Sequence, residues 1–129
     1  MPDTTTPNPE SVLLANTSNF EETAFEVFRY QYEHNTLYRA YCEALKTDVR
    51  TVIQLTDIPF LPISFFKTHD VITGSTSNKP ALVFESSKTT GDTASRHLIT
   101  DASVYEKSLL SGFNEFYGPP EDYVILALL

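Results

Sequence analysis

The chain has 129 residues, a formal net charge of -8 and a single cysteine. Its length suits one domain with a modest core, and its acidity argues against nucleic acid or an anionic membrane as the main partner. No apolar run approaches the roughly 20 residues of a membrane-spanning helix, and the first residues lack a signal-peptide pattern. Since Cys42 cannot form an internal disulfide, we expect a protein of the reducing cytoplasm.

Residues 1–17 are rich in Thr, Pro and Asn, a composition that predicts a flexible arm before a folded part spanning residues 18–129. Ser18 lies three residues before Glu21, which is the spacing of a capping box and indicates the start of a helix. Apolar residues then recur at helical spacing from Phe20 onwards.

A second helix is expected directly after the first. The sequence His34-Asn35-Thr36 suggests a break with Thr36 as the new N-cap, and an apolar stripe runs from Leu37 to Leu45 in a helix that also contains Cys42. The aromatic residues of this half are candidates for an acyl-chain pocket or for the core: Phe25, Phe28, Tyr30, Tyr32, Phe60, Phe65 and Phe66. Helical spacing favours a place in the core for the first four of these residues. For Cys42, which lies on the second helix, a packed and inert thiol is the favoured interpretation.

Prolines shape the middle of the chain. Pro59 and Pro62 exclude the interior of a regular helix or strand between residues 58 and 62. Ser64 is predicted to cap a short helical turn that carries Phe65 and Phe66 inward. Residues 74–80 have the composition of a surface loop.

The second half is predicted as strand, loop, strand, helix and strand. The first two strands are Ala81–Phe84 and Arg96–Thr100, and Asp101 is the expected N-cap of the helix. Gly118 marks the end of this helix, before two prolines. The apolar run Tyr123–Leu129 is typical of a strand covered on both faces, as in parallel sheets.

These elements predict an α/β fold in which an N-terminal helical pair packs on a small, mostly parallel sheet. The chain ends on its most hydrophobic predicted strand, without a further helix to cover it. We therefore expect a truncated, incomplete part of a longer fold.

The loop after the first predicted strand carries the main functional signal. The sequence Ser86-Ser87-Lys88-Thr89-Thr90-Gly91 combines hydroxyl side chains with a lysine and a glycine. Backbone N–H groups and hydroxyls converge on anions where small residues let the chain come close. The loop is therefore a candidate phosphate-binding loop, whereas its composition alone favours a solvated linker.

Four stretches in this order carry a family resemblance: residues 28–33, 58–67, 86–97 and 112–126. Together they resemble the acyl-protein synthetase family of the bacterial luminescence fatty-acid reductase system. That family is similar to the wider acyl-adenylating superfamily of AMP-forming ligases. The resemblance runs from about Phe20 to the last residue and covers the N-terminal third of such an enzyme.

The resemblance implies that Ser86–Gly91 binds the phosphates of ATP. Ser87, Thr89 and Thr90 would face the β- and γ-phosphates, and Gly91 would allow the turn. Lys88 stands where the family pattern has glycine. It either strains the loop by about 1 kcal/mol if φ must be positive, is tolerated there, or supplies a charge to the phosphates.

The activity that the resemblance implies is ATP-dependent activation of a carboxylic acid, expected to be a fatty acid. The resulting acyl-adenylate would pass its acyl group to a thiol, with Mg²⁺ neutralising the triphosphate. The isolated chain is expected to be inactive, because the resemblance places the adenine-binding segments and the mobile C-terminal domain beyond it. The catalytic residues remain unassigned.

Two further interpretations concern other residues. His97 could lie near bound phosphates, but an exposed or half-buried strand histidine is the favoured interpretation. His34 and His69 lack metal-ligand spacing, so no metal site is predicted. The alternative function is a non-catalytic interaction module that self-associates or recruits a partner through the strand 123–129.

Overall fold

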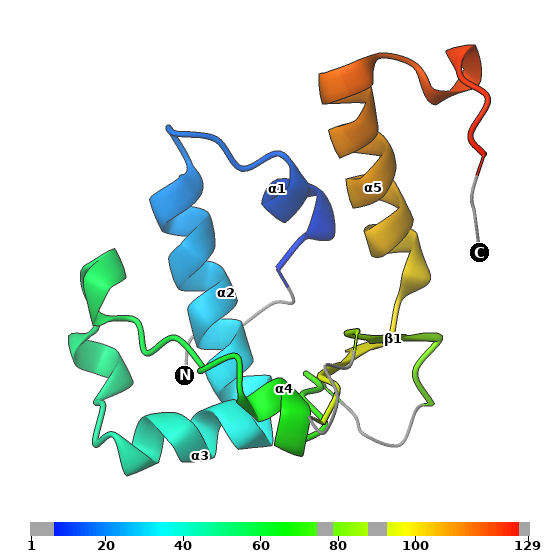
Figure 1. Ribbon diagram of the computed structural model, residues 1–129. Helices are drawn as coiled ribbons and strands as arrows, with labels where there is room; N and C mark the ends of the chain where they lie inside the picture. Colours follow the sequence, from blue (N-terminus) through cyan, green and yellow to red (C-terminus); the bar gives the residue numbers. More distant parts are fainter. Residues whose placement is uncertain (1–6, 75–78, 88–92, 127–129) are drawn as a thin grey trace.

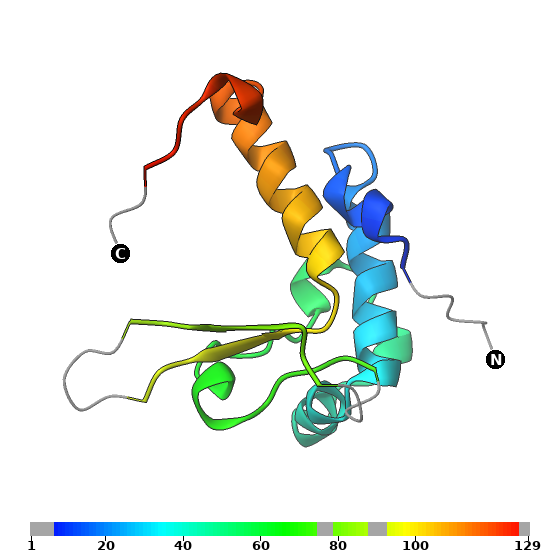
Figure 2. The same ribbon diagram turned by 90° about the vertical axis from the view of Figure 1, so that its right-hand side faces the viewer.

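The computed structural model describes residues 7–74, 79–87 and 93–126 (Figure 1). The helices are α1 (Pro9–Leu13), α2 (Phe20–His34), α3 (Thr36–Ala44), α4 (Phe65–Thr68) and α5 (Ala102–Tyr117), with short 3₁₀ turns η1 (Val49–Thr51), η2 (Leu55–Asp57) and η3 (Pro120–Asp122). The strands are β1 (Leu82–Glu85) and β2 (Arg96–Ile99). Figure 2 shows the hairpin of β1 and β2 projecting from a helical body, with α5 rising beside α1 and α2.

The predicted helical pair is confirmed as α2 and α3, but each N-cap lies one residue from its predicted position. The N-cap of α2 is Asn19, which makes no side-chain capping hydrogen bond, and the Ser18 hydroxyl donates to Asn16 Oδ1 over 2.6 Å. The N-cap of α3 is Asn35, whose Oδ1 accepts the Tyr38 N–H over 3.0 Å. The side chain of Arg39 donates to carbonyls in the last turn of α2, which joins the two helices.

The core lies where α2 and α3 meet the segment after them. Its buried members are Phe28, Tyr38, Cys42, Val52 and Ile58. The rings of Phe28 and Tyr38 meet edge to face with centroids 6.2 Å apart, and Tyr38 Oη donates to the Pro59 carbonyl over 2.7 Å. Cys42 is fully buried, which confirms the packed thiol.

The segment around the two prolines is irregular, as predicted, and leads into α4. Ser64 is the N-cap of α4, although its side chain makes no capping hydrogen bond. Phe65 contacts Tyr41 on α3 with ring centroids 5.5 Å apart, and Phe66 stacks on His97 of β2 at 4.7 Å. The predicted inward turn is thus a bridge between the helical pair and the hairpin.

The prediction of a mostly parallel sheet is wrong for the described residues. β1 and β2 pair antiparallel, with Leu82 opposite Ile99 and Glu85 opposite Arg96. Only residues 86–95 separate the strands, and parallel strands need a crossover of a dozen or more residues. Helix α4 packs on β2, and Tyr105 of α5 contacts Phe84 of β1 with ring centroids 4.9 Å apart.

The end of the chain differs from the prediction as well. Asp101 caps α5 by accepting the Ser103 N–H over 2.9 Å, and Gly118 ends the helix with φ 88°, as predicted. Tyr123 is extended, but none of residues 123–126 belongs to a strand. The remainder of the predicted last strand, residues 127–129, lies outside the described residues.

Candidate functional site

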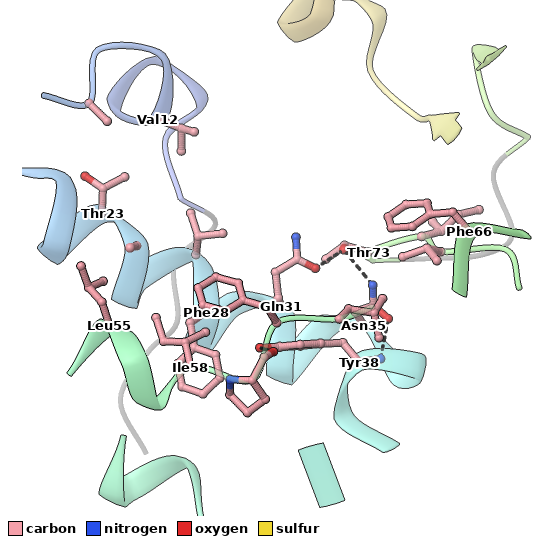
Figure 3. Close-up of a pocket in the computed structure, with 18 of the residues that line it drawn as sticks. Val12, Thr23, Phe28, Gln31, Asn35, Tyr38, Leu55, Ile58, Phe66 and Thr73 are labelled. Carbon is pink, nitrogen blue, oxygen red and sulfur yellow. Dashed lines mark hydrogen bonds between the residues drawn. The ribbon is translucent and has the colours of Figure 1, made fainter. Parts of the chain in front are cut away.

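A cavity with a volume of about 920 Å³ lies beside α2 (Figure 3). Side chains of α1, α2, the 55–61 segment and residues 71–73 surround it, and β2 closes one side. Its lining is mostly apolar: Val12, Ala15, Phe20, Ala24, Val27, Phe28, Leu55, Ile58, Pro59, Phe60, Leu61, Phe66, Val71, Ile72 and Leu98. The other described lining residues are the uncharged Thr23, Gln31, Asn35, Tyr38, Thr56, Thr73 and Thr100.

One hydrogen-bonded chain of polar side chains interrupts the apolar wall. Asn35 Nδ2 donates to Thr73 Oγ1 over 3.2 Å, and Thr73 Oγ1 donates to Gln31 Oε1 over 2.5 Å. Asn35 is only 3% exposed. The Gly74 N–H also donates to the His34 carbonyl over 2.8 Å, so that the 71–74 segment is anchored where α2 ends.

This chain of bonds fixes the orientation of the Gln31 amide. Asn35 Oδ1 accepts the Tyr38 N–H, so Asn35 must present its Nδ2 to the Thr73 oxygen. The Thr73 hydroxyl hydrogen is therefore directed at Gln31 Oε1. Gln31 Nε2 then points away from Thr73 into the pocket (Figure 3), where no described residue accepts a hydrogen bond from it.

Of the predicted phosphate-binding residues, Ser86 and Ser87 directly follow β1. Ser86 donates its N–H to the Ser95 carbonyl and accepts the Ser95 N–H at its Oγ, both over 3.0 Å. Ser87 is exposed beyond this closure. The remaining predicted residues, Lys88, Thr89, Thr90 and Gly91, lie outside the described residues. In Figure 2 the described ends of β1 and β2 point away from the helices.

Charged residues gather at the loop end of the hairpin, next to Ser86. Arg96 on β2 pairs with Asp70 over 3.1 Å and with Glu85 on β1 over 4.0 Å. A second cavity, of about 300 Å³, is lined by Phe66, Lys67, Thr68, His69, Asp70 and Arg96. Arg96 is therefore a cationic side chain at the loop end of the hairpin, directly opposite Glu85.

His97 and Cys42 have structural roles in the described part of the chain. His97 is an exposed residue of β2 that stacks on Phe66, which agrees with the favoured interpretation of a strand histidine. Burial raises the pKa of the Cys42 thiol, so the nucleophilic thiolate is disfavoured. Burial, followed by the proximity of Cys42, raises the pKa of Tyr38 as well.

No group of three His, Cys, Asp or Glu side chains in residues 7–74, 79–87 and 93–126 could hold a metal ion. Within the same residues, no helix has both the length and the apolar character needed to cross a membrane.

Phe28, Phe60 and Phe66, three of the candidates for an acyl-chain pocket, line this cavity, but its polar side is not predicted from the sequence. Gln31 follows Val27 and Phe28 at helical spacing, and nothing local connects it with Thr73, which lies 42 residues later. The one available signal was an amide at a stripe position otherwise occupied by apolar residues, such as Val27 and Phe28.

Comparisons with known proteins agree on one group of enzymes. A family model described as "Acyl-protein synthetase, LuxE" matches residues 15–117. The chain is 37% identical over 71 residues to a "Long-chain-fatty-acid--luciferin-component ligase" from Photorhabdus luminescens. This match covers 55% of the chain and 60% of the relative's length. No solved structure was found to match the chain.

Proposed function

The chain belongs to the LuxE acyl-protein synthetase family, and from that premise we propose that it serves the ATP-dependent activation of a fatty acid. In this reaction a carboxylate oxygen of the acid attacks the α-phosphorus of ATP and pyrophosphate leaves. A thiol then attacks the acyl carbon of the acyl-adenylate, and AMP leaves. The match over residues 15–117 carries the proposal, since it includes both the helical pair and the hydroxyl-rich loop.

Within this function we assign the phosphates of ATP to Ser86–Gly91. Ser86 is already bonded to Ser95 through its N–H and its Oγ, so its part is to close the hairpin. The hydroxyls of Ser87, Thr89 and Thr90 are then the proposed donors to phosphate oxygens. Donors placed where pyrophosphate departs stabilise the charge that develops there.

The described side chains at the hairpin fit a magnesium-bound triphosphate in their chemistry. Ser87 is an exposed hydroxyl, and Arg96 is a cation next to the carboxylates of Asp70 and Glu85. Guanidinium groups bind phosphate oxygens, and carboxylates suit the hydrated Mg²⁺ ion. Mg²⁺ would neutralise the triphosphate charge near this otherwise acidic chain.

Calorimetric titration with Mg·ATP tests the loop assignment. We expect a Lys88→Gly variant to bind Mg·ATP at least as tightly as the parent, since glycine accepts positive φ without strain. A Thr89→Val, Thr90→Val double variant should lose that binding while its circular dichroism stays unchanged. Failure of both the parent and Lys88→Gly to bind Mg·ATP would contradict the assignment.

Turnover is the second part of this test. We expect no exchange of pyrophosphate into ATP by the 129-residue chain alone with any fatty acid, because the match to the Photorhabdus luminescens ligase covers only 60% of that enzyme's length. Exchange that depends on both the acid and the chain would contradict this expectation.

One observation favours a second candidate function, self-association through the last described residues. Val124 is 90% exposed and Leu126 is 89% exposed, next to the extended Tyr123. Extended apolar segments recruit strands. A monodisperse dimer in sedimentation equilibrium that Val124→Lys converts to a monomer would favour this function, whereas a monomeric parent would exclude it.

A further inference from the structure

We propose that the pocket beside α2 holds the hydrocarbon chain of the acyl substrate, with the acyl carbonyl oxygen accepting a hydrogen bond from Gln31 Nε2. The identity of this ligand rests on the proposed function, whereas the existence of the site rests on the pocket. The inference revises the interpretation of the aromatic residues as core alone, since Phe28, Phe60 and Phe66 also line the cavity.

The size and lining of the pocket suit a long apolar chain. Its volume of about 920 Å³ lies within the roughly 300–1,000 Å³ of typical small-molecule sites. The described lining contains no Asp, Glu, Lys, Arg or His. A charged ligand placed within such a wall would lose its hydration without gaining a partner, so the part of the ligand that enters must be uncharged.

The hydrogen-bonded side chains of Asn35, Thr73 and Gln31 offer the ligand one hydrogen-bond donor at a defined place. Thr73 Oγ1, which accepts from Asn35 Nδ2, donates to Gln31 Oε1, and this leaves Nε2 as a neutral donor directed into the cavity. Sites of this kind combine an apolar wall with a few polar groups that orient the ligand. A neutral amide donor suits the carbonyl oxygen of an acyl group better than it suits a carboxylate, which would bring its full charge into the pocket.

The anchoring of the site indicates that it is built before a ligand arrives. Thr73 is tied to α2 through Gln31, and Gly74 is tied to the end of the same helix through the His34 carbonyl. Asn35 is buried with its side-chain oxygen on the Tyr38 N–H. Because these bonds join residues from α2, α3 and the 71–74 segment, the donor position does not depend on one mobile side chain.

Binding of saturated fatty acids to the 129-residue chain tests the inference. Octanoic, decanoic and dodecanoic acids would be titrated below their micellar concentrations, with the methyl ester of decanoic acid as an uncharged probe. We expect saturable binding with one site, and affinity rising by up to about fourfold for each added methylene until the pocket is full. The ester should bind at least as well as the acid.

Two variants and a matched control locate the site. Ala24 lines the pocket on α2, so Ala24→Phe should fill part of it and weaken dodecanoic acid binding at least tenfold. Ala40 is exposed on α3 and does not line the pocket, so Ala40→Phe should leave the affinity unchanged. Gln31→Glu keeps an acceptor for Thr73 but removes the donor, and it should weaken binding of the ester by about five- to tenfold.

The outcomes separate this inference from the proposed function. Acid binding that is absent in the folded parent, or equal in Ala24→Phe and Ala40→Phe, overturns the inference even if Mg·ATP binds. Acid binding that follows the variants while Mg·ATP fails to bind supports the pocket and contradicts the loop assignment. A dimer that Ala24→Phe dissociates, in a chain that binds no acid, assigns the pocket to a second copy and also overturns the inference.

Discussion

Thr73 donates its hydroxyl hydrogen to Gln31 Oε1 over 2.5 Å and thereby joins the 71–74 segment to α2 across 42 residues of sequence. The same hydroxyl oxygen accepts from Asn35, which is buried at the junction of α2 and α3. One hydroxyl group therefore organises the polar side of the pocket.

Replacement of Thr73 by valine should destabilise the chain. The valine leaves the Asn35 amide without its acceptor, and an unsatisfied buried donor costs about 1–3 kcal/mol. Urea unfolding followed by circular dichroism would measure the loss. Thr73→Ser keeps the hydroxyl and should retain most of the stability, whereas equal losses in the two variants would show that the methyl group matters instead.

Replacement of Tyr38 by phenylalanine should cost about 0.5–1.5 kcal/mol of unfolding free energy. The change removes the 2.7 Å hydrogen bond to the Pro59 carbonyl but keeps the ring against Phe28. Tyr41 provides the matched control, because its hydroxyl makes a longer, exposed bond of 3.3 Å to the Phe60 carbonyl. Tyr41→Phe should therefore change stability less, and the reverse order would contradict this account.

Replacement of glycine by alanine should have opposite effects on stability at Gly118 and Gly112. Gly118 ends α5 with φ 88° and ψ -170°, a region that is essentially limited to glycine, so Gly118→Ala should destabilise by about 1–3 kcal/mol. Gly112 lies inside α5 with no atom within 4 Å of an added Cβ. Gly112→Ala should stabilise by about 0.5–1 kcal/mol. Thermal unfolding of both variants tests the pair, and a shared sign would contradict it.

Alkaline pH should weaken the fold through two buried groups. Burial raises the pKa of Cys42 above its ordinary 9.0 and the pKa of Tyr38 above its ordinary 10.0. In both cases the unfolded chain releases the proton first, so stability is complete below about pH 9 and falls as the pH rises above it. Urea unfolding at a series of pH values would measure how the free energy of unfolding depends on pH. Cys42→Ala should flatten the first part of the decline, and Tyr38→Phe should flatten the later part.

Local signals explain why most helices could be predicted. Asp101 and Gly118 bracket α5 with a side-chain cap and a positive φ, both of which depend on a few adjacent residues. The start of α2 shows the limit of such signals. Ser18 has capping spacing, but its hydroxyl bonds Asn16, and the helix starts one residue later, after Asn19.

The sheet and the pocket depended on contacts between distant residues. Only the ten residues 86–95 separate the two strands, and this short connection by itself indicates an antiparallel pair. The prediction of a mostly parallel sheet was wrong because it relied on the apolar run from Tyr123 instead. The pocket needs Gln31, Asn35 and Thr73 to meet, which no periodicity encodes. The phosphate assignment of Ser86–Gly91 stays a prediction.

The most direct test of the central claim is nuclear magnetic resonance of the ¹⁵N-labelled chain during titration with Mg·ATP. The account predicts saturable shifts of the backbone amides of residues 86–91 and of Arg96, larger in Lys88→Gly, with little change in α5. Absence of saturable shifts in both forms, or shifts confined to residues outside the hairpin, would contradict the claim that this chain binds the triphosphate of an acyl-activating enzyme.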